Sequence, residues 1–369
     1  MRHCVRATSF CLYICEDRSM RLFFEDAVRV ENKIVFFCRN INLLCSLGIE
    51  DGTVEIVDSM PEGLLKDQRL CGSIAEFHGD LIMVPLEARN IWIFTIKTKT
   101  WRKITLKEYA CCRDKSYFRN CYLYENKLFL FGGYYPALVV VDLMKNEVDY
   151  NLSILENKNI NANDLYFRGM PIEVDGRLFI ASSFENSVLI LDKATLHHEW
   201  KTVGKKDSRY SGIVFDGHSF WLAPRKYLPI IKWNGDSETY FDLPGGIDKS
   251  EAVYSGIVSM DDCFLISATP GSQTDSLKVD KNGKATSTEE KYILCKKLDS
   301  GDVILQTEDG KVIYQELNGQ KHEYKLEIEN DVFYEMLSNA GIDKKALVDG
   351  ILMEGKEMDL RNWISVIKD

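Results

Sequence analysis

The stretch AVRVENKIVFF, residues 27 to 37, contains the pattern that decides the fold. Two runs rich in β-branched and aromatic residues flank Glu31-Asn32, a pair suited to a tight turn. The same pattern recurs at residues 74 to 84, 121 to 131, 171 to 181, 213 to 223, 257 to 267 and, in weaker form, 295 to 305. Each copy predicts a β-hairpin.

The copies are evenly spaced. If the residue after each turn is taken as the reference, successive copies begin 47, 47, 50, 42, 44 and 39 residues apart. A second turn follows each reference residue after 15 to 19 residues, so every repeat contains two hairpins and four strands. Four-stranded repeats of about 40 to 50 residues are typical of propeller blades. The sequence therefore predicts an all-β protein, a seven-bladed β-propeller of four-stranded antiparallel blades.

The chain divides into three parts on this basis. The propeller is expected at residues 20 to 328, between an N-terminal extension at residues 1 to 19 and a short helical C-terminal tail at residues 329 to 369. The extension matches none of the repeats, which makes Met20 a candidate for the natural start.

The tail is expected to contain two helices. Asn330 or Asp331 is suited to cap the first, and Gly341 to end it. Asp359 is suited to cap the second, whose apolar face includes Trp363. This face is expected either to pack on the propeller or to dock a partner.

Three segments resemble kelch repeats, a class of propeller blade. Residues 130 to 133, Leu-Phe-Gly-Gly, look like the kelch glycine doublet. Residues 93 to 101 and 189 to 200 resemble the outer kelch hairpin, which ends in a tryptophan, here Trp101 and Trp200. The other blades lack these features. The resemblance implies a kelch-like propeller over roughly residues 20 to 328, and such propellers include enzymes as well as binding proteins.

Composition narrows the class of partner. The 369 residues are 45% hydrophobic and 11% aromatic, as in a globular protein with a core. The net charge of -10 argues against broad binding to nucleic acid or anionic membranes, and no apolar run has the length of a membrane span. The 11 cysteines include no CxxC pair and no zinc-ribbon spacing, which indicates a reduced, cytoplasmic protein.

Familiar catalytic signatures are missing. The sequence has no phosphate-binding GxxxxGK[ST], no GxGxxG after a strand, no GxSxG and no HExxH. None of the six histidines falls at a channel position in the register of the repeats. We therefore expect no metal site, no cofactor and no histidine-based catalysis.

The strongest candidate site is the mouth of the central channel. The first strand of each blade lines a propeller channel, and positions seven to nine residues before each reference residue are expected to meet at one opening. The candidates there are Glu25, Asp26, Ser73, Arg119, Asn120, Arg168, Tyr210 and Tyr254. Arginine forks bind carboxylate or phosphate, and aromatic rings offer flat apolar surface. Alternatively, the aromatic residues pack the blades, and Glu25 and Asp26 form structural ion pairs with Arg119 and Arg168.

Loops on the same face supply a second set of candidates. They connect the second and third strands of the blades, where exposed aromatic and charged residues suit recognition. The set is Arg89, Tyr134, Tyr135, Arg225 and Tyr227.

Three functions remain open from sequence. The favoured one is a non-catalytic propeller that binds a small polar ligand, a glycan or a protein segment at the channel mouth. The second is an enzyme that acts on a glycan or small polar substrate there. The third is a scaffold that recruits a partner through the C-terminal helix.

Overall fold

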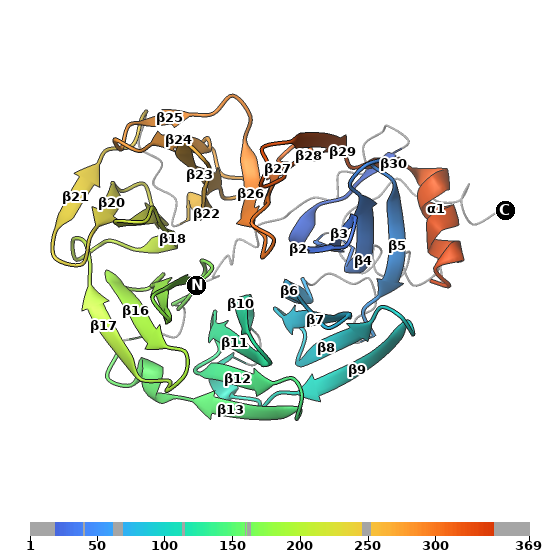
Figure 1. Cartoon of the computed structure of the whole chain (residues 1–369), viewed down its shortest axis with the longest axis horizontal. Helices are drawn as coiled ribbons and strands as arrows, with labels where there is room; N and C mark the ends of the chain where they lie inside the picture. Colours follow the sequence, from blue (N-terminus) through green and yellow to red (C-terminus); the bar gives the residue numbers. More distant parts are fainter. Residues whose placement is uncertain are drawn as a thin grey trace, which may run out of the picture.

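The computed structural model describes residues 19 to 342, except 40, 62 to 68, 113 to 114, 159, 161 to 163 and 246 to 251. Seven four-stranded antiparallel sheets surround one axis (Figure 1). Strand order follows chain order within every sheet, so each blade is one continuous segment. The predicted seven-bladed propeller is confirmed.

The first three blades come from the N-terminal part of the chain. The first contains β2 (Phe24–Val30), β3 (Lys33–Cys38), β4 (Leu43–Gly48) and β5 (Val54–Ser59). The second contains β6 (Cys71–Phe77), β7 (Asp80–Pro85), β8 (Asn90–Thr95) and β9 (Thr100–Thr105). After the 3-10 turn η1 (Ala110–Cys112), the third contains β10 (Phe118–Tyr124), β11 (Lys127–Gly132), β12 (Leu138–Asp142) and β13 (Glu147–Asn151).

Four more blades complete the ring. After η2 (Ser153–Leu155), the fourth contains β14 (Ile172–Val174), β15 (Arg177–Ala181), β16 (Ser187–Asp192) and β17 (His198–Thr202). The fifth contains β18 (Tyr210–Phe215), β19 (Phe220–Pro224), β20 (Ile230–Trp233) and β21 (Glu238–Phe241). The sixth contains β22 (Tyr254–Ser259), β23 (Cys263–Ala268), β24 (Leu277–Asp280) and β25 (Ala285–Ser287). The seventh contains β26 (Tyr292–Lys297), β27 (Val303–Thr307), β28 (Lys311–Gln315) and β29 (Lys321–Lys325).

The conformations of the outer turns explain why the sequence pattern predicted the hairpins correctly. Six of the seven predicted outer turns contain a residue with positive φ, such as Lys99 (52°) or Gly283 (89°). In the fourth blade this residue is Leu196 (61°), one position after the predicted Ala194-Thr195. Turns of this kind match the twist of the strands they connect and hold them in register.

The core lies between the blades. Along β3, Ile34 and Phe36 pack toward the seventh blade, whereas Val35 and Phe37 pack toward the second. Successive side chains of a strand point to opposite faces, and here both faces are buried, so the inner strands read as continuous apolar runs. Each of the seven seams between blades has its own hydrophobic cluster.

The ring closes where the first and seventh blades meet. Just before β2, β1 (Ser19–Arg21) pairs with β30 (Glu327–Glu329) as a short two-stranded ribbon. The buried side chain of Gln306 accepts a hydrogen bond from Phe24 N (2.8 Å) and donates one to Leu22 O (3.0 Å). The side-chain amide of this seventh-blade residue therefore binds backbone groups at the start of the first blade.

One helix follows the propeller. Helix α1 (Asn330–Asn339) lies outside the ring beside β5 (Figure 1). It buries Phe333 and Leu337 in the hydrophobic cluster between the first and seventh blades. Gly341 follows its end with φ of 74°, as predicted for the stop. Residues 1 to 18 of the predicted extension, and the second predicted helix with Trp363, lie outside the described residues.

The two tryptophans of the kelch-like hairpins connect neighbouring blades. Trp101 in β9 donates its indole N–H to Asp58 in the first blade (3.0 Å). Trp200 in β17 donates to the Ile154 carbonyl in η2, before the fourth blade (2.9 Å), and Lys158 lies 3.9 Å from its ring centroid. A late tryptophan thus ties an outer strand to the segment before its own blade.

Candidate functional site

A β-bulge recurs at one position of the inner strands. The register between first and second strands shifts at Glu25, at Gly72, at Arg119 and Asn120, at Ser211, at Ser255 and at Ile293. A bulge inserts an extra residue and turns its side chain away from the regular alternation. In the fourth blade, Arg168 occupies the same place in irregular backbone before β14. The repeat therefore presents one ring of side chains at one end of the channel.

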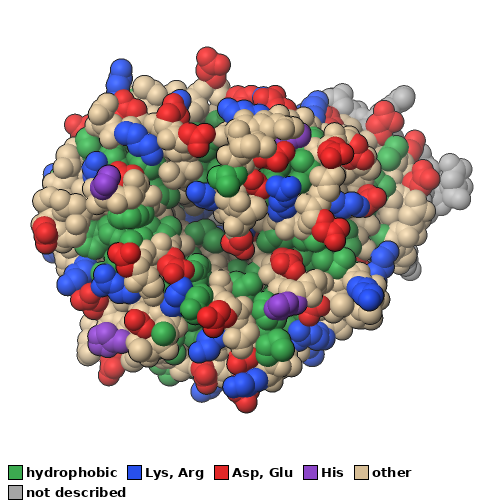
Figure 2. Space-filling model, viewed as in Figure 1, with side chains coloured by type: hydrophobic (Ala, Val, Ile, Leu, Met, Phe, Trp, Pro, Cys, Tyr) green, Lys and Arg blue, Asp and Glu red, His purple; other side chains and the backbone are tan. Residues whose placement is uncertain are grey.

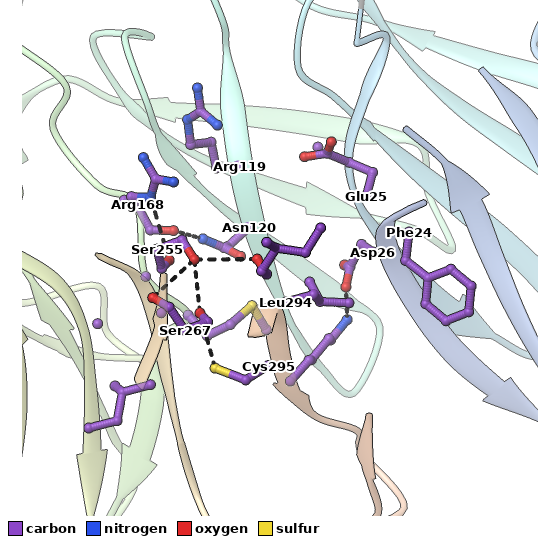
Figure 3. Close-up of a pocket in the computed structure, with 18 of the residues that line it drawn as sticks. Phe24, Glu25, Asp26, Arg119, Asn120, Arg168, Ser255, Ser267, Leu294 and Cys295 are labelled. Carbon is purple, nitrogen blue, oxygen red and sulfur yellow. Dashed lines mark hydrogen bonds and ion pairs between the residues drawn. The ribbon is translucent and has the colours of Figure 1, made fainter. Parts of the chain in front are cut away.

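The bulged positions other than Ser211 line a cavity at the mouth of the channel, together with Arg168 (Figure 3). Its volume is about 130 Å³, and its lining includes five of the predicted residues: Glu25, Asp26, Arg119, Asn120 and Arg168. We call this cavity the channel-mouth pocket. It also contains Arg39 and Arg69, and Arg69 is a residue that the repeat pattern did not single out because it lies in the connection before β6.

Glu25 is the acidic centre of the pocket. Arg69 binds both of its carboxylate oxygens, with Nε 2.7 Å from Oε2, and Arg39 Nε lies 3.7 Å from the same Oε2. The side chain of Glu25 is only 7% exposed. Burial alone would raise the pKa of Glu25, but the charges of Arg69 and Arg39 and the hydrogen bonds from Arg69 lower it overall. Glu25 is therefore a carboxylate at neutral pH.

Arg119 and Arg168 are not paired in this way, although the charge of Glu25 attracts Arg119 from a distance. Neither forms an ion pair with a carboxylate of the described residues, and the buried Nε of Arg119 has no hydrogen-bond partner there. Arg168 donates from Nε only to the Ser255 carbonyl, at 3.4 Å. Burial, followed by repulsion from Arg69, lowers the pKa of Arg119 to about 10. The pKa of Arg168 is lowered well below its ordinary value, by burial and then by the charges of Arg119 and other arginines.

Further charges surround these two arginines. Arg225, which follows β19, adds to the positive potential at both Arg119 and Arg168. Glu87 lies between β7 and β8, and burial raises its pKa despite attraction to Arg69 and Arg119. A chain with net charge -10 thus concentrates guanidinium groups at the axis of its ring.

The floor of the pocket is a satisfied ion pair. Lys296 Nζ lies 2.6 Å from Asp26 Oδ1, and Asp26 Oδ2 accepts hydrogen bonds from Ser73 Oγ (2.5 Å) and Ile74 N (2.9 Å). Neither Glu25 nor Asp26 pairs with Arg119 or Arg168, in contrast to the structural pairing that the sequence suggested. The predicted Ser73 lies below this floor, in a second cavity of about 300 Å³ toward the other end of the channel.

The remaining predicted residues lie away from the pocket. Tyr210 and Tyr254 are buried between blades, and Tyr210 donates its hydroxyl to the Val203 carbonyl (2.5 Å). Tyr135 is a core residue that donates to the Lys107 carbonyl (2.5 Å). These rings fill the space between blades, the alternative that the sequence had left open for the aromatic positions.

The other loop candidates are partly exposed. The guanidinium of Arg89 stacks on the Tyr117 ring at 4.9 Å, and Lys115 lies 5.4 Å from the Tyr134 ring centroid. Tyr227 donates to the Pro244 carbonyl at 2.8 Å, and Arg225 donates to the Ser183 carbonyl at 3.3 Å. Of the loop set, Arg225 acts electrostatically on both Arg119 and Arg168, and Tyr134 acts on Arg119.

The crowding of the inner strands explains the small residues beside the arginines. A Cβ on Gly169 would lie 2.5 Å from Gly212 Cα and 2.7 Å from the Ser211 carbonyl oxygen. Only glycine fits such a close backbone approach.

On the face seen in Figure 2, acidic and basic side chains are interspersed around a central hollow.

Other kinds of site find no support in the described part of the chain. No group of three or more His, Cys, Asp or Glu residues there could hold a metal ion. Among the same residues, no helix has the length and apolarity needed to cross a membrane.

Comparisons with known proteins identify the fold. No family model and no curated protein matches the chain. Among solved structures, a streptogramin B lyase is 12% identical with a TM-score of 0.56, over 81% of this chain and 91% of the lyase. The computationally designed Ika8 protein is 9% identical with a TM-score of 0.53, over 83% and 88%. BamB from Moraxella catarrhalis is 12% identical with a TM-score of 0.50, over 83% and 89%. The chain is a β-propeller, similar in fold to propellers with different functions and not specifically to kelch proteins.

Proposed function

We propose that this protein is a ligand-binding propeller that captures an anionic group in the channel-mouth pocket. The observation that carries the proposal is the pair Arg119 and Arg168, two guanidinium groups in one pocket without a carboxylate partner among the described residues. A buried charge without a counter-charge costs several kcal/mol. An anionic ligand would remove that cost, because guanidinium forks bind carboxylate and phosphate oxygens through charge-assisted hydrogen bonds.

The form of the pocket supports recognition of a small group. Its volume of about 130 Å³ is below the range of about 300 to 1,000 Å³ for drug-sized ligands. An engineered cavity of about 150 Å³ holds benzene, so one small ligand or one terminal group fits. The Asp26–Lys296 ion pair forms a floor below that group.

Acid–base catalysis has weaker support. A general acid at neutral pH needs a raised pKa, whereas the pKa of Glu25 is lowered by its arginine partners. A neutral glycan would also leave the guanidinium charges uncompensated. That the blades are kelch-like stays a proposal, based on the glycine doublet and the two late tryptophans.

A thermal-shift screen of small anions against the full chain tests the proposal. At a ligand concentration of about 100 times Kd, binding adds about 2.7 kcal/mol of stability, which raises Tm by about 3 to 4 °C in a protein of this size. We expect this shift in the wild type and in Arg102→Gln, a matched control on β9 that is bonded to Asp80 and Asn146. Arg119→Gln and Arg168→Gln should abolish it.

The Tm values of the variants without ligand show whether a substitution affects the fold or only ligand binding. Because burial and repulsion from Arg69 outweigh the attraction of Glu25 at Arg119, the Tm of Arg119→Gln without ligand should equal or exceed that of the wild type. An anion that stabilises Arg119→Gln and Arg168→Gln as much as the wild type would place the binding site elsewhere.

A further inference from the structure

We infer that the ligand of the channel-mouth pocket carries a tetrahedral dianion of the phosphate or sulfate type rather than a single carboxylate. The inference deepens the proposed function and rests on it. It uses the charge and the geometry of the five groups that meet in the pocket: Glu25, Arg39, Arg69, Arg119 and Arg168.

Glu25 shows what one carboxylate requires in this pocket. Its two oxygens are both taken by the fork of Arg69, and Arg39 adds a longer contact to Oε2. A carboxylate is thus satisfied by one arginine fork with help from a second arginine. The pocket already contains this arrangement, and neither Arg119 nor Arg168 takes part in it, so these two arginines form a second donor set.

The second donor set calls for more charge and more acceptors than a monocarboxylate has. Arg119 and Arg168 carry two positive charges without a carboxylate partner in the described residues. Each guanidinium offers five N–H donors in a fixed plane. One carboxylate has two oxygens and one charge, so the second arginine would keep both an unbalanced charge and unfilled donors. A tetrahedral dianion balances two charges and offers oxygens in two planes, one toward each fork.

The volume of the pocket also favours a phosphate-type group. A cavity of about 130 Å³ accommodates an inorganic phosphate or the terminal group of a phosphate ester, with the rest of an ester outside the pocket. Arg225, which raises the positive potential at both donor arginines, lies among the loops of the same face, where it would face that remainder.

The anionic group can belong to a phosphate ester or to a free inorganic ion, and calorimetry on the full chain at pH 7.5 distinguishes these two sources. The probes are inorganic phosphate, phenyl phosphate, sulfate and benzoate. We expect Kd for both phosphate-type probes and for sulfate at least tenfold lower than for benzoate. Arg119→Gln and Arg168→Gln should each weaken the dianions at least tenfold, with Arg102→Gln unchanged. Tighter binding of phenyl phosphate than of inorganic phosphate identifies an ester ligand, and the reverse identifies a free ion.

A pH comparison provides a second measurement. A phosphate monoester gains its second charge near pH 6, whereas sulfate is a dianion from pH 5 to 7.5. We expect phenyl phosphate to bind at least fivefold more tightly at pH 7.5 than at pH 5 relative to sulfate. The charged groups that line the pocket are Glu25, Asp26, Lys296 and the arginines, and Glu87 interacts with two of these arginines. All of them act on both probes, so the ratio isolates the ligand's own charge.

The outcomes distinguish this inference from the proposed function. Benzoate binding as tightly as phosphate, with the same dependence on Arg119 and Arg168, would overturn the dianion inference and leave the anion site standing. Arginine-independent binding, or no binding of any probe, would overturn both. Arg119→Lys keeps the charge and removes the fork, so retention of wild-type affinity in that variant would also contradict the geometric argument.

Discussion

Lys296 Nζ in the last blade lies 2.6 Å from Asp26 Oδ1 in the first blade, and both side chains are at most 10% exposed. The two residues are 270 positions apart. The same carboxylate accepts hydrogen bonds from Ser73 and Ile74 of the second blade, so one buried aspartate joins three blades at the axis. The same group therefore contributes both to the closure of the ring and to the floor of the pocket.

Asp26→Asn should destabilise the protein by about 3 kcal/mol, because it leaves the ammonium of Lys296 buried without an anion. The exposed pair Lys33–Glu55 provides the control, and Glu55→Gln should cost less than about 1 kcal/mol. Urea unfolding of the three proteins measures the difference. Equal midpoints for Asp26→Asn and the wild type would show that the ion pair contributes nothing net.

Gln306→Ala should cost about 2 kcal/mol. The substitution leaves the N–H of Phe24 and the carbonyl of Leu22 without the amide that bonds them in a buried place. Gln320, an exposed glutamine near the start of β29, is the matched control, and its alanine variant should be within about 0.5 kcal/mol of the wild type. Hydrogen exchange of the Phe24 amide gives a local readout, and unchanged protection there would contradict the bridging role.

Glu25→Gln should have a pH-dependent cost. The pKa of Glu25 is lower in the folded protein than its ordinary value of 4.5, so the unfolded chain takes up the proton first as the pH falls. Its contribution is complete above about pH 4.5 and is lost as the pH falls through the folded-state pKa. We expect a cost of about 3 kcal/mol at pH 7 that shrinks below pH 4.5.

Denaturant unfolding between pH 3 and pH 7 measures this cost, with the exposed Glu31→Gln as control. A difference between wild type and Glu25→Gln that stays constant over the whole range would refute the electrostatic origin of the stabilisation.

Gly169→Ala should destabilise the protein by about 1 to 3 kcal/mol, the usual cost of overpacking. The added methyl group would meet backbone atoms of Ser211 and Gly212 at 2.7 Å and 2.5 Å. Gly256 on the inner strand β22 is a matched control, because a Cβ there would have its nearest neighbour at 3.5 Å. Thermal unfolding should therefore separate the two alanine variants, and identical Tm values would argue that the inner strands have room to move apart.

Part of the site follows from the repeat alone. Because equivalent positions of a repeat occupy equivalent places, counting from the turns was enough to bring Glu25, Arg119 and Arg168 to one opening. The same counting placed Tyr210 and Tyr254 there as well, but their rings turn into the seams between blades. The bulges decide this, since they send the neighbouring Ser211 and Ser255 away from the regular alternation. Nothing in the residue pattern marks a bulge in advance.

By itself the sequence determined the blades, because a hairpin is set by its own turn and by strand alternation, all within about 20 residues. Only the tertiary structure decided which charges meet. Arg69 binds Glu25 across 44 positions and Lys296 binds Asp26 across 270, and these partners depend on how seven blades pack around the axis. The same packing places Arg119 and Arg168 in one pocket without a carboxylate ion pair. Electrostatic interactions depend on distance in space and not on order along the chain.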